Sequence, residues 1–137
     1  MKFRPLFLFV FLLLAVQSWA GGLMGGSYDD CVNKLGQPVK HLETGNKIVS
    51  DLWTFEQGDW SIEVGIWDKN VHLISYKHKD GKQISANEVK ALLAGFGDGF
   101  AWKQEGLGSY RRTDDKMKAK TTQEGLSILT TELARNL

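Results

Sequence analysis

The segment Trp60–Trp67 (WSIEVGIW) constrains the fold more than any other part of the sequence. Aromatic or aliphatic residues occupy its even-numbered positions, and mostly polar or small residues stand between them. Successive side chains of a strand point to opposite faces, so this period of two predicts a strand with one face on a core. Strand-like segments at 48–56 and 71–78 flank it across short turns. Together the three segments predict an antiparallel meander.

Two short helices are predicted by capping boxes. A serine is followed three residues later by an acidic residue at Ser27 and at Ser85. In this pattern the serine and the acidic side chain bond the free amides at a helix start, so helices are predicted to begin after Ser27 and Ser85. Gly36 and Pro38 end the first helix, and Gly95 or Gly97 ends the second. Apolar residues recur at helical spacing in both segments, which gives each helix one face to pack on the sheet.

Weaker strand patterns follow the second helix, at residues 100–104, 109–112, 116–120 and 126–133. The fold class predicted is therefore α+β, with two short helices packed on an antiparallel β-sheet meander. Because a helix followed by strands occurs twice, the order of elements leaves open a helix-strands unit repeated twice.

The first twenty residues have the pattern of a targeting segment. Lys2 and Arg4 precede an apolar run of 11 residues at 6–16, and Ser18 and Ala20 place small residues at a cleavage site. The run is shorter than the roughly 20 apolar residues that a bilayer-spanning helix needs. The pattern predicts a cleaved secretory signal peptide over 1–20 and a periplasmic or extracellular protein.

The remaining chain divides into a glycine-rich leader at 21–26, predicted to be flexible, and a single α+β domain at 27–137. Loss of Lys2 and Arg4 changes the formal net charge from +1 to −1. A balanced charge argues against a nucleic-acid partner. The single cysteine, Cys31, excludes an internal disulfide framework and a cysteine-based zinc site.

No catalytic, cofactor-binding or metal-binding residue is predicted. His72 and His78 fall on one face of their strand, but six residues place them about 20 Å apart, too far to share a metal. The glycine-rich loop at 95–100 follows a helix, whereas phosphate loops precede one. The alternative of a small periplasmic hydrolase with a dispersed site around the His72/His78 strand stays open.

Several aromatic and basic side chains are predicted to form an interaction surface. Lysines alternate with small or apolar residues at 116–120, so three ammonium groups face solvent. They either protect an edge strand from pairing or dock an acidic partner or lipid headgroups. An outward-facing Trp67 is either covered by the rest of the chain or exposed for recognition. The predicted surface comprises Trp67, Tyr76, His78, Arg111, Arg112, Lys116, Lys118 and Lys120.

The stretch 24–38 (MGGSYDDCVNKLGQP), followed by strands that include 71–76 (VHLISY), resembles the SmpA/OmlA-like outer-membrane-assembly lipoproteins and the beta-lactamase-inhibitor-protein-like modules. Val32, Leu35, Gly36 and Pro38 match their capped helix that ends Leu-Gly-x-Pro. The chain lacks the lipidated cysteine of the assembly lipoproteins, and it is also similar to small exported proteins of unknown function from bacteria. The resemblance implies a helix-plus-antiparallel-sheet unit that is used for protein-protein contact.

The function expected from these observations is that of a non-catalytic protein-binding module of the cell envelope. Its partner is expected to be another envelope or extracellular protein. No nucleic acid, cofactor or stable membrane anchor after cleavage is expected.

Overall fold

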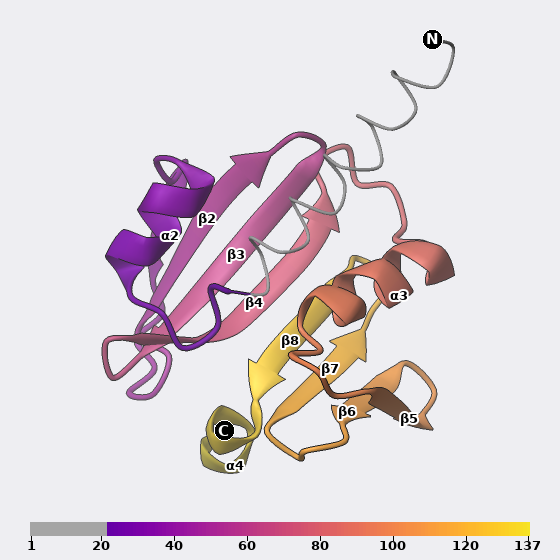
Figure 1. The fold of residues 1–137 in the computed structure, drawn as a ribbon. Helices are drawn as coiled ribbons and strands as arrows, with labels where there is room; N and C mark the ends of the chain where they lie inside the picture. Colours follow the sequence, from indigo (N-terminus) through magenta and orange to yellow (C-terminus); the bar gives the residue numbers. More distant parts are fainter. Residues whose placement is uncertain (1–21) are drawn as a thin grey trace, which may run out of the picture.

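The computed structural model describes residues 22–137, so the predicted signal peptide lies outside the described residues. Within this range the chain forms three short helices and eight strands (Figure 1). In chain order they are α2 (Tyr28–Leu35), β1 (Lys40–Glu43), β2 (Asp51–Gln57), β3 (Trp60–Trp67), β4 (Asn70–His78), α3 (Ala86–Gly95), β5 (Trp102–Gly106), β6 (Ser109–Arg112), β7 (Met117–Thr121), β8 (Leu126–Thr130) and α4 (Thr131–Asn136).

All eight strands belong to one antiparallel sheet with the order β1-β2-β3-β4-β8-β7-β6-β5. Each half of the described chain forms a helix followed by four strands. The last strands of the two halves, β4 and β8, pair at the centre of the sheet. There Ile74 lies opposite Ile128 and Tyr76 opposite Leu126. The α+β class is confirmed, and the helix-strands order occurs twice across this central pair.

Helices α2 and α3 pack on the same face of the sheet (Figure 1). Both begin with the predicted capping boxes, in which the hydroxyl groups of Ser27 and Ser85 accept hydrogen bonds from the N–H groups of Asp30 and Glu88. Their apolar sides meet a set of fully or nearly buried strand residues. The core residues on strands β2, β3, β4, β7 and β8 are Phe55, Ile62, Val64, Val71, Ile74, Tyr76, Ala119, Leu126 and Ile128.

The flexible leader expected from the glycine content is not observed for residues 22–26. The Gly25 N–H donates to the Val71 carbonyl, and the Val71 N–H donates to the Gly26 carbonyl, both at 2.8 Å. Leu23 is fully buried in the core. The backbone of Gly25 and Gly26 therefore pairs with β4 beyond the end of β8. These hydrogen bonds and the burial of Leu23 hold the segment in place although it is rich in glycine.

Two further expectations about element bounds are wrong. Residues 40–43, for which the sequence pattern predicts no strand, form strand β1, because pairing with β2 supplies hydrogen-bond partners that the local sequence does not indicate. The last predicted strand, 126–133, ends at Thr130, whose hydroxyl group caps α4 by accepting from the Leu133 N–H. No helix among the described residues is long and apolar enough to cross a bilayer.

Candidate functional site

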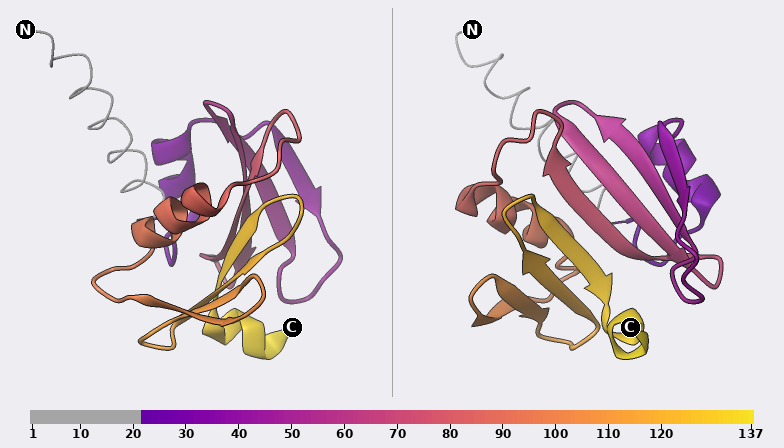
Figure 2. Two further views of the ribbon diagram at one scale, coloured as in Figure 1. Left: turned by 90° about the vertical axis from the view of Figure 1, so that its right-hand side faces the viewer. Right: turned by 180° about the vertical axis from the view of Figure 1, so that it is seen from behind.

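The face of the sheet opposite α2 and α3, which we call the open face, is the candidate site. Figure 2 (right) shows this face, with α4 at the end of the sheet. Ala119 of β7 is buried toward the helices, so its neighbours Lys118 and Lys120 point to the open face. The strand register then identifies the open-face residues of every other strand.

One cross-strand row traverses the open face from edge to edge. Its members stand opposite one another in successive strand pairs. Starting from β5, they are Lys103, Arg111, Lys118, Leu129, Leu73, Gly65, Leu52 and Leu42. We call the first three residues with the adjacent Lys120 the basic end, and the four leucines with Gly65 the leucine end. The open face therefore has a charged half and an apolar half.

Arg111 is the only member of the basic end with carboxylate partners in the described chain. Its Nε lies 2.7 Å from Glu105 Oε1, and its Nη1 lies 2.8 Å from Asp115 Oδ1. For Lys103, Lys118 and Lys120 no carboxylate of the described residues lies within 4.0 Å. Directly opposed like charges destabilise a sheet. Lys103 and Lys118 both stand opposite Arg111, and the carboxylates of Glu105 and Asp115 offset the repulsion there.

The position of β7 bears on the two interpretations of its lysines. Strand β7 lies between β6 and β8, and the sheet edges are β1 and β5. Because Lys118 and Lys120 are on an interior strand, protection of an edge does not account for them. The exposed Lys116 precedes β7 in the turn after Asp115, where its backbone N–H donates to Asp114.

The leucine end is partly covered by the loop between β1 and β2. Val49 of this loop is buried and approaches Gly65, where an added Cβ atom would lie 3.1 Å from Val49 Cγ1 and 3.0 Å from Leu73 Cβ. Glycine at position 65 thus allows the loop to pack on the sheet. At the outer edge, Leu42 remains 48% exposed.

A hollow of about 620 Å³ lies beside this row on the open face. One of its lining residues is Glu63, which stands opposite Thr54 on β2 and Ser75 on β4. The hydroxyl groups of Ser75 and Ser127 lie 2.8 Å apart across the β4-β8 junction. Hydroxyl groups, carboxylates and lysines line the hollow: Lys40, Thr54, Glu56, Ser61, Glu63, Ser75, Lys77, Thr122, Glu124 and Ser127. This lining offers hydrogen bonds rather than an apolar pocket.

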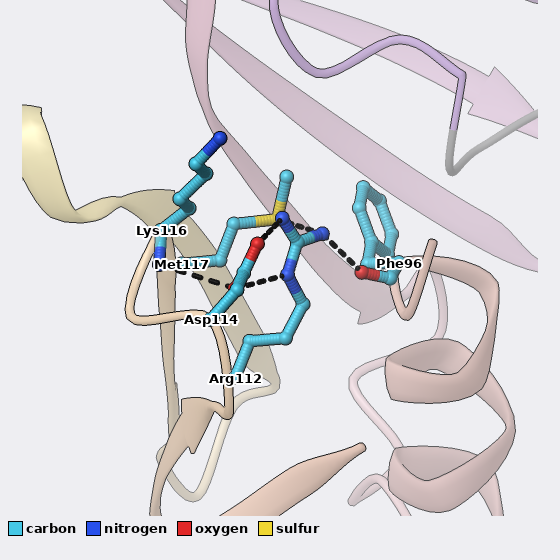
Figure 3. Close-up of polar contacts among 5 residues, drawn as sticks. All are labelled: Phe96, Arg112, Asp114, Lys116 and Met117. Carbon is cyan, nitrogen blue, oxygen red and sulfur yellow. Dashed lines mark hydrogen bonds and ion pairs between the residues drawn. The ribbon is translucent and has the colours of Figure 1, made fainter. Parts of the chain in front are cut away.

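Arg112 is not part of an accessible surface, contrary to the sequence prediction. It is 4% exposed and points toward the helix-covered face (Figure 3). Its Nε and Nη2 atoms donate to the two carboxylate oxygens of Asp114 at 2.8 and 2.7 Å, and Nη1 donates to the Phe96 carbonyl at 2.9 Å. These hydrogen bonds hold the pKa of Asp114 below its ordinary value. Arg112 therefore joins the end of α3 to the β6-β7 turn.

Tyr76 and His78 also face the helices instead of a partner. Tyr76 is 3% exposed, and this burial raises the pKa of its phenol. His78 stacks on Trp60 with ring centroids 4.2 Å apart, and its Nε2 lies 2.9 Å from Glu88 Oε2. Burial raises the pKa of Glu88, but hydrogen bonds from Ser85 and His78 outweigh it and lower that pKa overall. The prediction that Tyr76 and His78 form a surface is wrong, since both stabilise the packing of α3.

Trp67 is half-buried at the end of β3, and its ring lies 4.9 Å from that of His72. His72 Nδ1 in turn lies 2.8 Å from Thr130 Oγ1. A register shift beside Gly65 and Ile66 interrupts the alternation near His72. His72 and His78 thus have separate partners, and neither lines the open-face hollow. The expected Trp67 surface is partly covered.

A third histidine has partners that sequence spacing did not reveal. His41 lies on β1 opposite Trp53, with the rings stacked at 3.8 Å, and its Nε2 is 2.8 Å from Asp51 Oδ1. Hydrogen bonds from His41 and Ser50 lower the pKa of Asp51. Tyr28 of α2 covers Trp53 from a centroid distance of 4.5 Å. Only the pairing of β1 with β2 brings these residues together.

Among residues 22–137 the structure contains no group of three or more His, Cys, Asp or Glu side chains that would hold a metal. Cys31 is buried in α2, and this burial raises the pKa of its thiol to about 11. A thiol with so high a pKa is a poor nucleophile at neutral pH. Cys31 therefore acts as a small apolar core residue.

Comparisons with known proteins add little to this description. No family model matches the chain, and no curated protein matches it. Among solved structures, an extracellular protein containing a SCP domain from Bacillus anthracis str. Ames is similar at 12% sequence identity with a TM-score of 0.47. The alignment covers 83% of this chain and 46% of that protein, so the chain spans less than half its length.

Proposed function

We propose that the chain is an exported, non-catalytic protein-binding module, and that it contacts another envelope or extracellular protein through the open face. The observation that carries this proposal is the pair of lysines, Lys118 and Lys120, on the interior strand β7. For Lys103, Lys118 and Lys120 no carboxylate of the described residues lies within 4.0 Å, so no ion pair with those residues accounts for them. Charged residues without a packing or pairing role in the fold are typical of binding surfaces.

The shape and chemistry of the open face support the same proposal. The hollow is lined by hydroxyl and charged groups, and it adjoins leucines that are only half-covered. Apolar area next to polar groups that can form hydrogen bonds is the usual composition of a protein-protein interface. Export is supported by the targeting pattern of residues 1–20.

Site-specific photocrosslinking in the native cell tests this function. A benzoylphenylalanine at Ser61, which lines the open-face hollow, is compared with one at Lys90, which is exposed on α3. The adduct is identified, the partner is purified, and the affinity of the two proteins is measured by calorimetry. We expect a discrete protein adduct from Ser61 and none from Lys90.

The purified pair should then lose affinity when the hollow is filled by Ser61→Trp, a substitution without charge. A partner bound equally well by wild type and Ser61→Trp would contradict the proposal. So would an adduct that forms from Lys90 as efficiently as from Ser61. Circular dichroism and thermal unfolding of both variants confirm that the comparison concerns folded proteins.

A further inference from the structure

We propose that the basic end of the open face binds an acidic segment of the partner protein, with Lys103, Lys118 and Lys120 as its counter-charges. This inference rests on the proposed function, because it gives the chemistry of the partner at the same face. It starts from the observation that these three ammonium groups have no carboxylate within 4.0 Å in the described chain.

The spacing of the basic end suits a short acidic stretch. Lys103, Arg111 and Lys118 stand on three adjacent strands, so about 10 Å separates the outer two. Lys120 follows Lys118 on the same face of β7, about 7 Å further along the strand. An extended acidic segment repeats its side chains on one face at about 7 Å. Two or three of its carboxylates would therefore meet the three lysines.

Arg111 shows that carboxylates bind at this place. Glu105 and Asp115 approach its guanidinium at 2.7 and 2.8 Å, so one cation of the group is already neutralised within the chain. The four cations and these two carboxylates leave a net charge of +2, and the cations without a carboxylate partner are the three lysines. An acidic segment would relieve the repulsion along the row while gaining its own ion pairs.

The surroundings of the basic end favour a protein segment over a lipid surface. Lys120 stands opposite Ser127, which lines the hollow, and Lys118 stands opposite the half-buried Leu129. A partner segment that binds the lysines can continue into the hollow, where polar side chains would contact it, and then onto the leucine end, where apolar side chains would. A flat bilayer cannot enter a hollow in the sheet. Charge complementarity and continuity with the hollow therefore favour an acidic segment of a protein at the basic end.

The first experiment measures binding of a fluorescein-labelled octaglutamate peptide by fluorescence anisotropy at low and at physiological salt. The test variant is Lys118→Glu/Lys120→Glu. The matched control, Lys34→Glu/Lys90→Glu, makes the same change of charge at exposed positions of α2 and α3. We expect at least about tenfold weaker binding for the test variant, a change below about twofold for the control, and weaker binding as salt rises. Equal loss in both variants would overturn the inference.

A parallel arm replaces the peptide with vesicles containing one third phosphatidylglycerol. If wild type binds these vesicles more tightly than the peptide, with the same dependence on Lys118 and Lys120, the occupant is a lipid surface and the inference is overturned. Weak vesicle binding beside clear peptide binding supports it.

The last arm uses the crosslinked partner and separates this inference from the proposed function. Loss of partner binding in both Ser61→Trp and Lys118→Glu/Lys120→Glu, with the helix control unchanged, supports both. Loss in Ser61→Trp alone keeps the proposed function and overturns the acidic partner. Retention in both open-face variants overturns both proposals.

Discussion

The helix-covered face and the open face use alternate residues of the same strands, yet they follow different rules. On β7 and β8 the side toward the helices holds Ala119 and Ile128, which are 3% and 0% exposed. The other side places Lys118 beside Arg111 and Leu129. Burial explains the first set completely, whereas the second set opposes like charges. The difference teaches that packing in the core accounts for the side chains of one face but not for the charged side chains of the other.

The largest effect is expected from a residue of the helix-covered face. Ile128→Ala should lower the free energy of unfolding by about 3 kcal/mol, because it leaves a cavity at the centre of the sheet. Ser127→Ala, one residue away on the open face, should cost about 1 kcal/mol or less through its lost hydroxyl contact with Ser75. Urea unfolding measures both. Similar losses from the two variants would contradict the distinction between the faces.

Arg112 provides the next test. It follows Arg111 directly in the sequence, but it lies on the helix-covered face whereas Arg111 lies on the open face. Arg112→Met should cost about 2 kcal/mol, since it leaves the Phe96 carbonyl without its donor in a buried position. Arg111→Met, on the open face, should cost less than about 1 kcal/mol. Thermal and urea unfolding of the pair would refute the assignment if Arg111→Met were the more damaging change.

The contribution of Arg112 should also depend on pH. Its hydrogen bonds lower the pKa of Asp114 from the ordinary value of 3.8, so the folded state favours the carboxylate. Such a group stabilises the fold above the unfolded pKa and ceases to do so as pH falls through the lower folded pKa. The stability difference between wild type and Arg112→Met should therefore shrink below about pH 4. A difference that stays constant to pH 2 would exclude this origin.

A smaller effect is expected where the β1-β2 loop meets the open face. Gly65→Ala should cost about 1–2 kcal/mol, because the added methyl group would press on Val49 and Leu73. Gly106→Ala is the control, as nothing lies within 4 Å of its added Cβ atom. Amide hydrogen exchange should show the loss concentrated in the loop at 44–50. A neutral Gly65→Ala would mean that the loop does not pack on the leucine end.

The smallest effect has the opposite sign. Lys118→Thr should raise the stability by about 0.5 kcal/mol, since it removes a cation opposite Arg111 and adds a residue that favours strands. Lys77→Thr on β4 should bring no comparable gain, because Lys77 stands opposite Ser61. Differential scanning calorimetry resolves such shifts. A destabilised Lys118→Thr would show that this lysine supports the fold.

Much of the local structure could be predicted because local physics determines it. The alternation at 60–67 gave β3 with its observed bounds, and each capping box gave the observed start of a helix. Strand β1 and helix α4 were missed since their conformations depend on β2 pairing and on the Thr130 cap. Among the candidate site residues, Arg111, Lys118 and Lys120 were found from the charge pattern, whereas Lys103 and the leucine end were not.

The sequence by itself determined the period of each strand, the helix starts and therefore which side chains of a strand share a face, because these follow from backbone geometry over a few residues. Only the tertiary structure decided which strands are neighbours. Pairing of β7 with β6 and β8 places β7 in the interior of the sheet, and pairing of β4 with β8 brings the three cations and the leucine end into one row. The contact with the Phe96 carbonyl buries Arg112 against the end of α3. Such pairing depends on contacts between residues far apart in the chain, which local patterns do not encode.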